Sequence, residues 1–326
     1  MKKKKKPPII VIPPTLGRYF ETGVDRTDWL AISPPPSELE SINIDNQGRL
    51  YDIRLAFTDF TIKPPATLEK PVGCRGVRHL RFGDLKIIGQ KNKQGIWIGG
   101  ARPKFADGSY GELIRSEDVS VRDCGIINTE FGIDLTECTD FDIAYNDISN
   151  FTRDGISIAC TGGYVGYNDI YNFSAEAGIG IHAGNKETII EWNKVHDCYL
   201  SQEELAKPEA ERTHPDLIQC FGNDGNIENL IIRYNEFYNA DQIGQICFRP
   251  NWGRNITFAY NKIWNDLPLD KPLKLWFSDI DGLNLIDNDF GVQIMLDNCK
   301  NVIARGNTYK YPPILENAVE FIERDF

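Results

Sequence analysis

A short phrase of an aromatic or small residue, Asn, a polar residue and an apolar residue returns from about residue 75 onward, with weaker copies at 287–290 and 306–309. It reads Tyr-Asn-Asp-Ile at both 145–148 and 167–170. Successive phrase asparagines are separated by 22, 25, 42, 26, 27 and 19 positions. Recurrence at this spacing indicates a repeat architecture, in which each copy packs mainly on its two neighbours. The phrase asparagines are Asn146, Asn168, Asn193, Asn235, Asn261, Asn288 and Asn307.

Each repeat also carries short stretches in which apolar and polar residues alternate, such as 139–144 and 155–159. Alternation over four to six residues predicts half-buried strands. The chain has 39 Ile, more than its 22 Leu or its 16 Ala, and this composition favours strands over helices. Three short strands cannot bury their own apolar face, but copies stacked about 4.8 Å apart form a continuous core. Asn at one fixed turn would then form a ladder.

These Asn turns and strand phrases resemble the right-handed parallel β-helix of the pectate-lyase-like superfamily, over roughly residues 75–310. The resemblance implies an all-β fold: a single-stranded right-handed parallel β-helix with repeats of about 20–27 residues. The superfamily includes polysaccharide lyases, glycoside hydrolases, alginate C5-epimerases and phage tailspike depolymerases, so the resemblance alone fixes no reaction.

We expect three segments along the chain. Residues 1–40 are rich in proline and predict an N-terminal arm or cap, and residues 41–310 predict the β-helix. Residues 311–326 predict a C-terminal capping segment. The spacing of Leu315, Val319 and Ile322 within it favours a short amphipathic helix.

Charge and terminal composition bear on partners and compartment. A net charge of −11 argues against nucleic-acid binding, which usually needs a basic excess. The five lysines at 2–6 precede too short an apolar run for a signal peptide, and no run could span a membrane. We therefore expect cytoplasmic synthesis, with virion association or export by another route left open. A homo-oligomer is common among tailspike-like relatives, although no coiled-coil segment predicts one here.

The eight cysteines form no Cys-x-x-Cys pair and recur about once per repeat. This spacing predicts buried thiols rather than disulfides or a zinc site. Asp-rich turns would offer oxygen ligands to Ca²⁺, but no specific motif predicts a metal site. The cofactor therefore stays unknown at this stage.

The strand that follows each Asn turn should point its isoleucines inward and the residues between them outward. Ile156 and Ile158, for example, would flank an outward residue. Small outward residues with interspersed acids favour a groove for a sugar chain over a flat solvated sheet. The predicted outward residues are Asp134, Ser157, Gly180, Gln219 and Cys247.

The sharpest local feature is the segment 213–219, in which His214 and Asp216 would project from one face of an extended strand. Histidine can serve as acid or base near neutral pH, and a carboxylate can orient it. His182 lies on the preceding repeat, at nearly the same predicted lateral position. Asp154 occupies a position equivalent to Asp216, two strand spacings or about 9.6 Å away. These four residues are the catalytic candidates; the alternative is a strand-entry turn shaped by Pro215.

An insertion accounts for the interval of 42 residues. The capping-box pattern Ser-Gln-Glu-Glu at 201–204 predicts a helix to about Lys207, which would raise a flap before His214. A tolerated excursion without function is the alternative interpretation.

Two loops could wall the same groove. The loop 99–110 offers Arg102 and Tyr110, and the loop 249–254 offers Arg249 and Trp252. Aromatic faces stack on sugar rings and Arg pairs with carboxylate or sulfate groups, although Trp252 could also pack on a neighbouring turn. The substrate-binding candidates are Gln219, Arg249, Trp252, Asp134, Arg102 and Tyr110.

These observations favour a polysaccharide-degrading enzyme, either a glycoside hydrolase or a lyase, with the glycan in a groove along the β-helix. A non-catalytic glycan-binding or structural phage tail protein remains an alternative, as does a uronate C5-epimerase. Alginate epimerases carry an Asp-Pro-His-acid motif, whereas this chain has His-Pro-Asp at 214–216. None of their catalytic residues is therefore carried across.

Overall fold

The structure is a computed structural model, and its description covers most of the chain after residue 65. The predicted arm at 1–40 lies outside the described residues. The described residues are 42–43, 66–68, 72–76, 78–83, 85–89, 94–100, 102, 109–174, 176–208, 211–212, 215–221, 226–241, 243–246, 253–266, 272–317 and 321–324.

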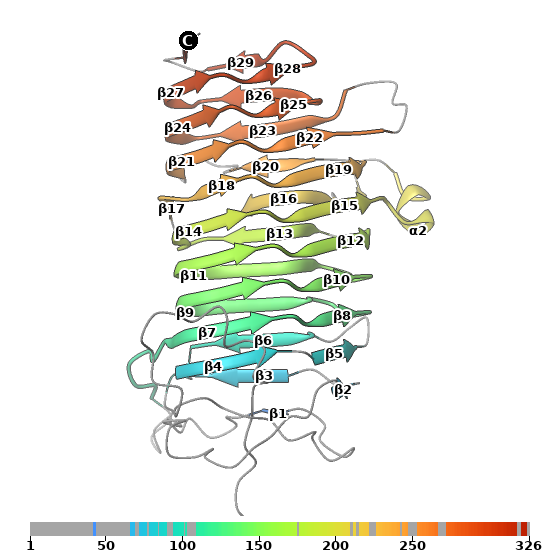
Figure 1. Ribbon diagram of the computed structural model, residues 1–326, viewed down its shortest axis with the longest axis vertical. Coiled ribbons are helices and arrows are strands. Elements are labelled where there is room, and N and C mark those ends of the chain that lie inside the picture. Colours follow the sequence, from blue (N-terminus) through green and yellow to red (C-terminus); the bar gives the residue numbers. More distant parts are fainter. Residues whose placement is uncertain are drawn as a thin grey trace, which may run out of the picture.

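The chain winds as a parallel β-helix, which confirms the predicted fold (Figure 1). Its described strands form one sheet of 20 strands and one of 10, and every strand pair described is parallel. The larger sheet bends, so each complete turn of chain contributes to three faces. Parallel pairing between successive turns places equivalent residues of neighbouring repeats side by side.

The first face follows the corner after the smaller sheet, and the second face follows the bend in the larger sheet. Strands β9 (Ile133–Ala144) and β11 (Asp154–Gly166) run through the bend and belong to both. The first face also contains β1 (Ile42–Asn43), β3 (Val72–Arg75), β6 (Ile96–Gly99), β13 (Ala177–His182), β16 (Asp216–Phe221), β20 (Gly244–Ile246), β23 (Lys274–Ser278), β26 (Gln293–Asp297) and β29 (Ile314–Glu316). The second face also contains β4 (Arg78–Gly83), β7 (Ser116–Arg122), β14 (Lys186–Glu191), β17 (Ile227–Glu228), β18 (Ile231–Arg233), β21 (Gly253–Ala259), β24 (Ile280–Ile286), β27 (Lys300–Arg305) and β30 (Phe321–Arg324).

The third face is the smaller sheet, built from strands of two to five residues. It contains β2 (Ala66–Leu68), β5 (Leu85–Ile88), β8 (Gly125–Ile127), β10 (Asp147–Ser149), β12 (Asp169–Phe173), β15 (Lys194–Cys198), β19 (Glu236–Ala240), β22 (Lys262–Trp264), β25 (Asp289–Phe290) and β28 (Thr308–Tyr309).

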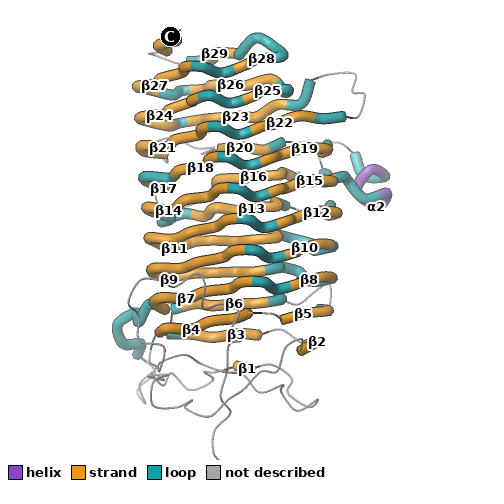
Figure 2. Tube along the Cα trace, viewed as in Figure 1, coloured by secondary structure: helices purple, strands orange, loops and turns teal. Residues whose placement is uncertain are grey.

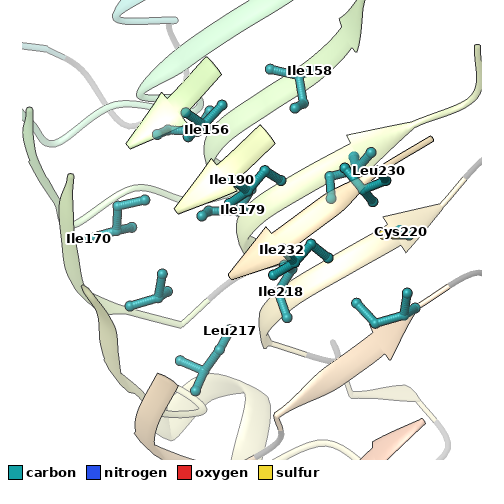
Figure 3. Packing of buried hydrophobic residues seen from close by; sticks show 14 of the residues in the cluster. Ile156, Ile158, Ile170, Ile179, Ile190, Leu217, Ile218, Cys220, Leu230 and Ile232 are labelled. Atoms are coloured by element: carbon teal, nitrogen blue, oxygen red, sulfur yellow. The ribbon is translucent and has the colours of Figure 1, made fainter. Parts of the chain in front are cut away.

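The core consists of columns of like residues. Ile133 pairs with Ile156, which pairs with Ile179, which pairs with Ile218, and all four side chains are fully buried. Figure 3 shows part of this stack, with Ile156, Ile179 and Ile218 on successive strands. Full burial of an isoleucine side chain contributes about 1.5–3 kcal/mol. The predicted inward orientation of these residues is therefore confirmed.

The phrase asparagines form the predicted ladder at the corner between the second and third faces. The backbone N–H and side-chain Nδ2 of Asn146 both donate to Oδ1 of Asn168, at 3.0 and 2.8 Å. Nδ2 of Asn146 also donates to the carbonyl of Val121 at 3.0 Å. The same pattern continues through Asn307, and across the 42-residue interval the Asn193–Asn235 bonds are 3.0 and 2.9 Å. Each amide thus joins one turn of the helix to the next.

The residue before each phrase asparagine adopts a positive φ, and at five of the seven positions it is aromatic, as at Tyr167 with φ of 57° and Trp192 with φ of 59°. This conformation is uncommon for residues other than Gly, Asn and Asp. Their rings stack in parallel on the outside of the corner, with a Trp192–Tyr234 centroid distance of 4.5 Å. Ring stacking contributes about 0.5–1.5 kcal/mol per pair, which helps to offset the backbone cost.

The predicted C-terminal helix is wrong. Ile314–Glu316 pairs with β26 and Phe321–Arg324 pairs with β27, both in parallel, while 318–320 lie outside the described residues. The apolar residues of this segment therefore extend the first and second faces by one more turn. The spacing of Leu315 and Ile322 that suggested a helical stripe reflects their place on two different strands.

The insertion forms the helix α2 (Gln202–Leu205), which projects beside the third face (Figure 2). The Oγ of Ser201 caps it by accepting from the N–H of Glu204 at 3.2 Å, as predicted. The helix is shorter than the predicted end at Lys207. Arg212 donates to the carbonyls of Leu205 and Lys207 at 3.1 and 3.0 Å, so these two carbonyls at the end of the helix have partners.

Six described cysteines are buried in the core, as their spacing predicts. Sγ of Cys138 and Cys299 lies within hydrogen-bonding distance of strand carbonyls. Within the described part of the chain, no helix has the length and apolar character needed to cross a membrane.

Substituting Asn193 with Ala should lower the free energy of unfolding by about 2–4 kcal/mol, because the backbone N–H and Nδ2 of Asn168 would both lose their acceptor while buried. Denaturant unfolding measures this difference. Asn284→Ala is the matched control, since that half-buried amide makes only a 3.4 Å contact with Thr257. A loss below about 1 kcal/mol for Asn193→Ala would contradict the ladder's stabilising role.

Candidate functional site

One outward column of the first face brings the candidate residues together. Asp134 pairs with Ser157, Ser157 with Gly180, and Gly180 with Gln219, as predicted. The next member is Gln245 rather than the predicted Cys247.

The register differs there because Ile218 lies opposite Gly244 instead of Ile246. Gly244 has φ of 148° and lies so close to the carbonyl of Ile218 that a Cβ could not fit. The chain therefore enters β20 two residues earlier than the sequence alignment predicted, and Ile246 still points into the core.

Asp134 is a buried carboxyl group that accepts two hydrogen bonds. Its Oδ1 accepts from the hydroxyl of Ser157 and its Oδ2 from the side-chain amide of Gln94, both at 3.0 Å. Only 7% of Asp134 is exposed. Burial raises the pKa of Asp134 to about 6, although the Ser157 hydrogen bond and His182 oppose this shift. Asp134 therefore titrates close to neutral pH.

Asp154 and His182 form a second pair on the same outer face. The Nε2 of His182 lies 3.3 Å from Oδ2 of Asp154. Asp154 is almost fully buried, whereas the imidazole is 34% exposed. Burial raises the pKa of Asp154 and His182 opposes that shift. Burial alone would lower the pKa of His182, but its hydrogen bond and charge interaction with Asp154 raise it overall.

Gly180 allows this pair to form. A Cβ at Gly180 would lie 2.9 Å from Oδ2 of Asp154, so the carboxylate occupies the space that a side chain would fill. The charges of Asp154 and His182 also act on Asp134. We call Asp134, Asp154 and His182 the acid–histidine set.

Asp216 lies outside this set. It occupies the position equivalent to Asp154, with Ala177 between them, which confirms the predicted two-strand separation. The residue is 1% exposed, and neither carboxylate oxygen has a hydrogen-bond partner among the described residues. Burial raises the pKa of Asp216 well above its ordinary value, which favours the protonated, neutral carboxyl group.

The register corrects the predicted position of His182. It pairs with Phe221, five residues beyond Asp216, so it does not lie beside Asp216. The site therefore centres on β9, β11 and β13 rather than on β16.

The remaining candidates are spread more widely. Gln219 lies one strand beyond Gly180 and is half-buried. Arg102 is exposed, and so is Tyr110, at 63%. Three candidates lie outside the described residues: His214, Arg249 and Trp252.

Sequence reasoning missed two residues beside the acid–histidine set. Trp97 lies opposite Asp134 on the preceding strand, and Gln94 donates to Asp134. The alternation Ile-Trp-Ile at 96–98 matches Ile-Asp-Leu at 133–135 and could have identified Trp97. Gln94 lies before its strand, where no pattern marks it. Within the described residues, no group of three or more His, Cys, Asp or Glu residues is arranged to hold a metal ion.

Comparison with solved structures gives distant structural neighbours. No family model matches the chain, and no curated protein matches its sequence. Similar solved structures include a mannuronan C-5 epimerase A-module from Azotobacter vinelandii (11% identity, 80% of each chain covered, TM-score 0.35). An alginate lyase from Paenibacillus sp. str. FPU-7 has 13% identity over 77% of this chain and 90% of its own (TM-score 0.39).

A phage protein, ORF18 of Geobacillus virus E2, is also similar, with 12% identity over 82% of this chain and 52% of its own (TM-score 0.29). The parallel β-helix of this chain is established by its own sheet topology. We transfer no residue role from any of them.

Substituting Ser157 with Ala should raise the pKa of Asp134 above about 6, because the serine hydroxyl stabilises the ionised carboxylate. Titration of the Asp134 carboxyl carbon by NMR measures the shift directly. Ser278→Ala, a buried serine on β23, is the control and should leave the Asp134 titration unchanged. A lower or unchanged pKa in Ser157→Ala would contradict the hydrogen bond.

Substituting Asp216 with Asn should stabilise the fold more at pH 7 than at pH 4. An unfolded Asp ionises near pH 3.9, whereas folded Asp216 stays protonated to a much higher pH. The free energy of unfolding of the wild type therefore falls by about 1.4 kcal/mol per pH unit as the pH rises from the unfolded to the folded pKa of Asp216. The Asn variant does not titrate and does not show this decrease. Urea unfolding across this pH range tests it, with exposed Asp289→Asn as control. An increase in stability of Asp216→Asn over the wild type that is the same at pH 4 and pH 7 would rule out the raised pKa.

Proposed function

We propose that the outer face of β9, β11 and β13 is the active site of a polysaccharide-cleaving enzyme. The observation that carries this proposal is the convergence of Asp134 with the Asp154–His182 pair around the bare backbone of Gly180. Shifted pKa values clustered on one outer face are typical of sites that transfer protons.

The pKa values assign the two roles. Near pH 7 Asp134, with a pKa of about 6, is mostly ionised. The ionised carboxylate accepts both of its hydrogen bonds, from Gln94 and Ser157. The raised pKa of His182 favours its charged form, with Nε2–H directed to Asp154. Nδ1 of His182 makes no hydrogen bond to any described residue. Asp134 is therefore the base, His182 the acid, and Asp154 positions and charges the imidazole.

In the proposed reaction Asp134 accepts a proton from water while the water oxygen bonds to the anomeric carbon. The glycosidic C–O bond breaks, and the leaving oxygen takes the proton from Nδ1 of His182. Two shorter sugar chains result, and solvent returns both residues to their starting states. Because water attacks the anomeric carbon directly and no covalent intermediate forms, this reaction inverts the configuration at that carbon.

The surroundings favour an uncharged glycan. Besides His182, Arg153 is a cation that acts on both Asp134 and Asp154, and Glu176 already engages its guanidinium at 3.1 Å. Trp97 and Trp276 are half-buried members of the same outward column, six strand spacings or about 29 Å apart. Their rings suit stacking on sugars at both ends of a bound chain.

Asp134→Asn and His182→Ala should each lower kcat/KM for the degraded glycan by about 10²–10⁴-fold, because each removes one proton-transfer group. Reducing ends released from a panel of neutral, amino-sugar and uronate polysaccharides measure cleavage. Activity should fall as the pH drops below about 6, where Asp134 becomes protonated.

Asp289→Asn, an exposed change on the third face, is the matched control and should retain activity. Unsaturated uronate products would indicate cleavage by elimination instead of hydrolysis, and altered uronate composition at constant chain length would indicate epimerisation. Binding without any product, or full activity of both variants, would overturn catalysis at this face.

A further inference from the structure

A second candidate site lies at the corner between the third and first faces. It is a cavity of about 350 Å³ beside the point where the insertion leaves the solenoid. This volume falls in the range of small-ligand pockets. The described residues that line it are Asn128, Asn150, Phe151, Thr152, Asn172, Phe173, Ser174, Asp197 and Tyr199.

The walls of this corner cavity are held in place by the repeat. Phe151 and Phe173 are buried and stack at a centroid distance of 4.5 Å, which provides an apolar part of the lining. Nδ2 of Asn172 donates to Oδ1 of Asn150 at 2.8 Å, so the two amides are fixed relative to each other. The N–H of Tyr199 donates to the carbonyl of Phe173 at 3.0 Å. Tyr199 is therefore held in place at the start of the next turn, before the chain leaves the solenoid as the insertion.

The polar groups of the cavity define the ligand. Three amides and three hydroxyls can each donate and accept hydrogen bonds. Asp197 is the single charged residue among the described lining residues. Its two oxygens already meet His196 at 2.9 Å and Asn239 at 3.5 Å. A ligand anion would find no lysine or arginine among those lining residues.

We propose that the corner cavity binds a single uncharged sugar unit. A hexopyranose combines many hydroxyl groups with apolar ring faces, which matches the amide and hydroxyl lining beside Phe151, Phe173 and Tyr199. This site is separate from the acid–histidine set and stands whether or not that face is catalytic. It makes the corner a second carbohydrate contact on the same protein.

The test is direct binding of methyl glycosides to the full chain, measured by ligand-observed NMR and calorimetry. The probes are the methyl glycosides of glucose, galactose and N-acetylglucosamine, with methyl glucuronide as the charged comparison. At least one neutral glycoside should bind, and the glucuronide should bind about tenfold more weakly or not at all. Ser174→Phe, which fills the cavity, should weaken neutral binding by at least about tenfold.

Two further variants keep the test decisive. Tyr199→Ala removes one wall and should weaken binding about fivefold even where Ser174→Phe fails to fold. Thr308→Phe adds the same ring at an exposed third-face position far along the solenoid and should leave binding unchanged.

Asp134→Asn separates this proposal from the catalytic one, because it should lower kcat/KM for cleavage by about 10²–10⁴-fold and retain glycoside binding. Loss of glycoside binding in Asp134→Asn would assign the ligand to the first face and overturn the corner site. Unchanged affinity in both cavity variants, or no binding of any neutral glycoside to the wild type, would overturn it as well.

Discussion

Every other feature of this protein depends on the buried amide ladder at one corner. Each phrase asparagine bonds the backbone and side chain of its neighbour at about 3 Å, so one turn of chain cannot slip against the next without losing several buried hydrogen bonds. Because register is fixed at this corner, isoleucines stack on isoleucines and outward residues stack on outward residues. The acid–histidine set is a consequence of that alignment, since its members lie up to 48 residues apart in the chain.

Repetition explains why the fold could be predicted from sequence. The Asn phrase and the alternating strands recur many times, so an error in one copy is corrected by the others. Inward residues such as Ile156 and Ile179 followed directly from this pattern. The end of the chain lacks that redundancy, and there Leu315 and Ile322 were assigned to a helix although they belong to two strands.

The chemistry was less predictable because it depends on departures from the repeat. Asp154 reaches His182 only because position 180 has no side chain, and no periodicity marks that glycine as special. Asp216 has the same place in the repeat as Asp154, yet it is buried with no hydrogen-bond partner among the described residues. Burial raises the pKa of both carboxyl groups, but only at Asp154 does a histidine oppose that rise. Sequence identified both acids, but only the packing separates their roles.

The insertion between Asn193 and Asn235 shows how such a scaffold can change its ligands. The ladder closes across those 42 residues with bonds as short as elsewhere, so the excursion leaves the stacked core undisturbed. The corner between the third and first faces, where the insertion leaves the solenoid, can therefore accept different loops. A different segment between the same two asparagines would alter the neighbouring cavity and leave Asp134, Asp154 and His182 in place on β9, β11 and β13. The corner cavity and the acid–histidine set can consequently change independently of each other.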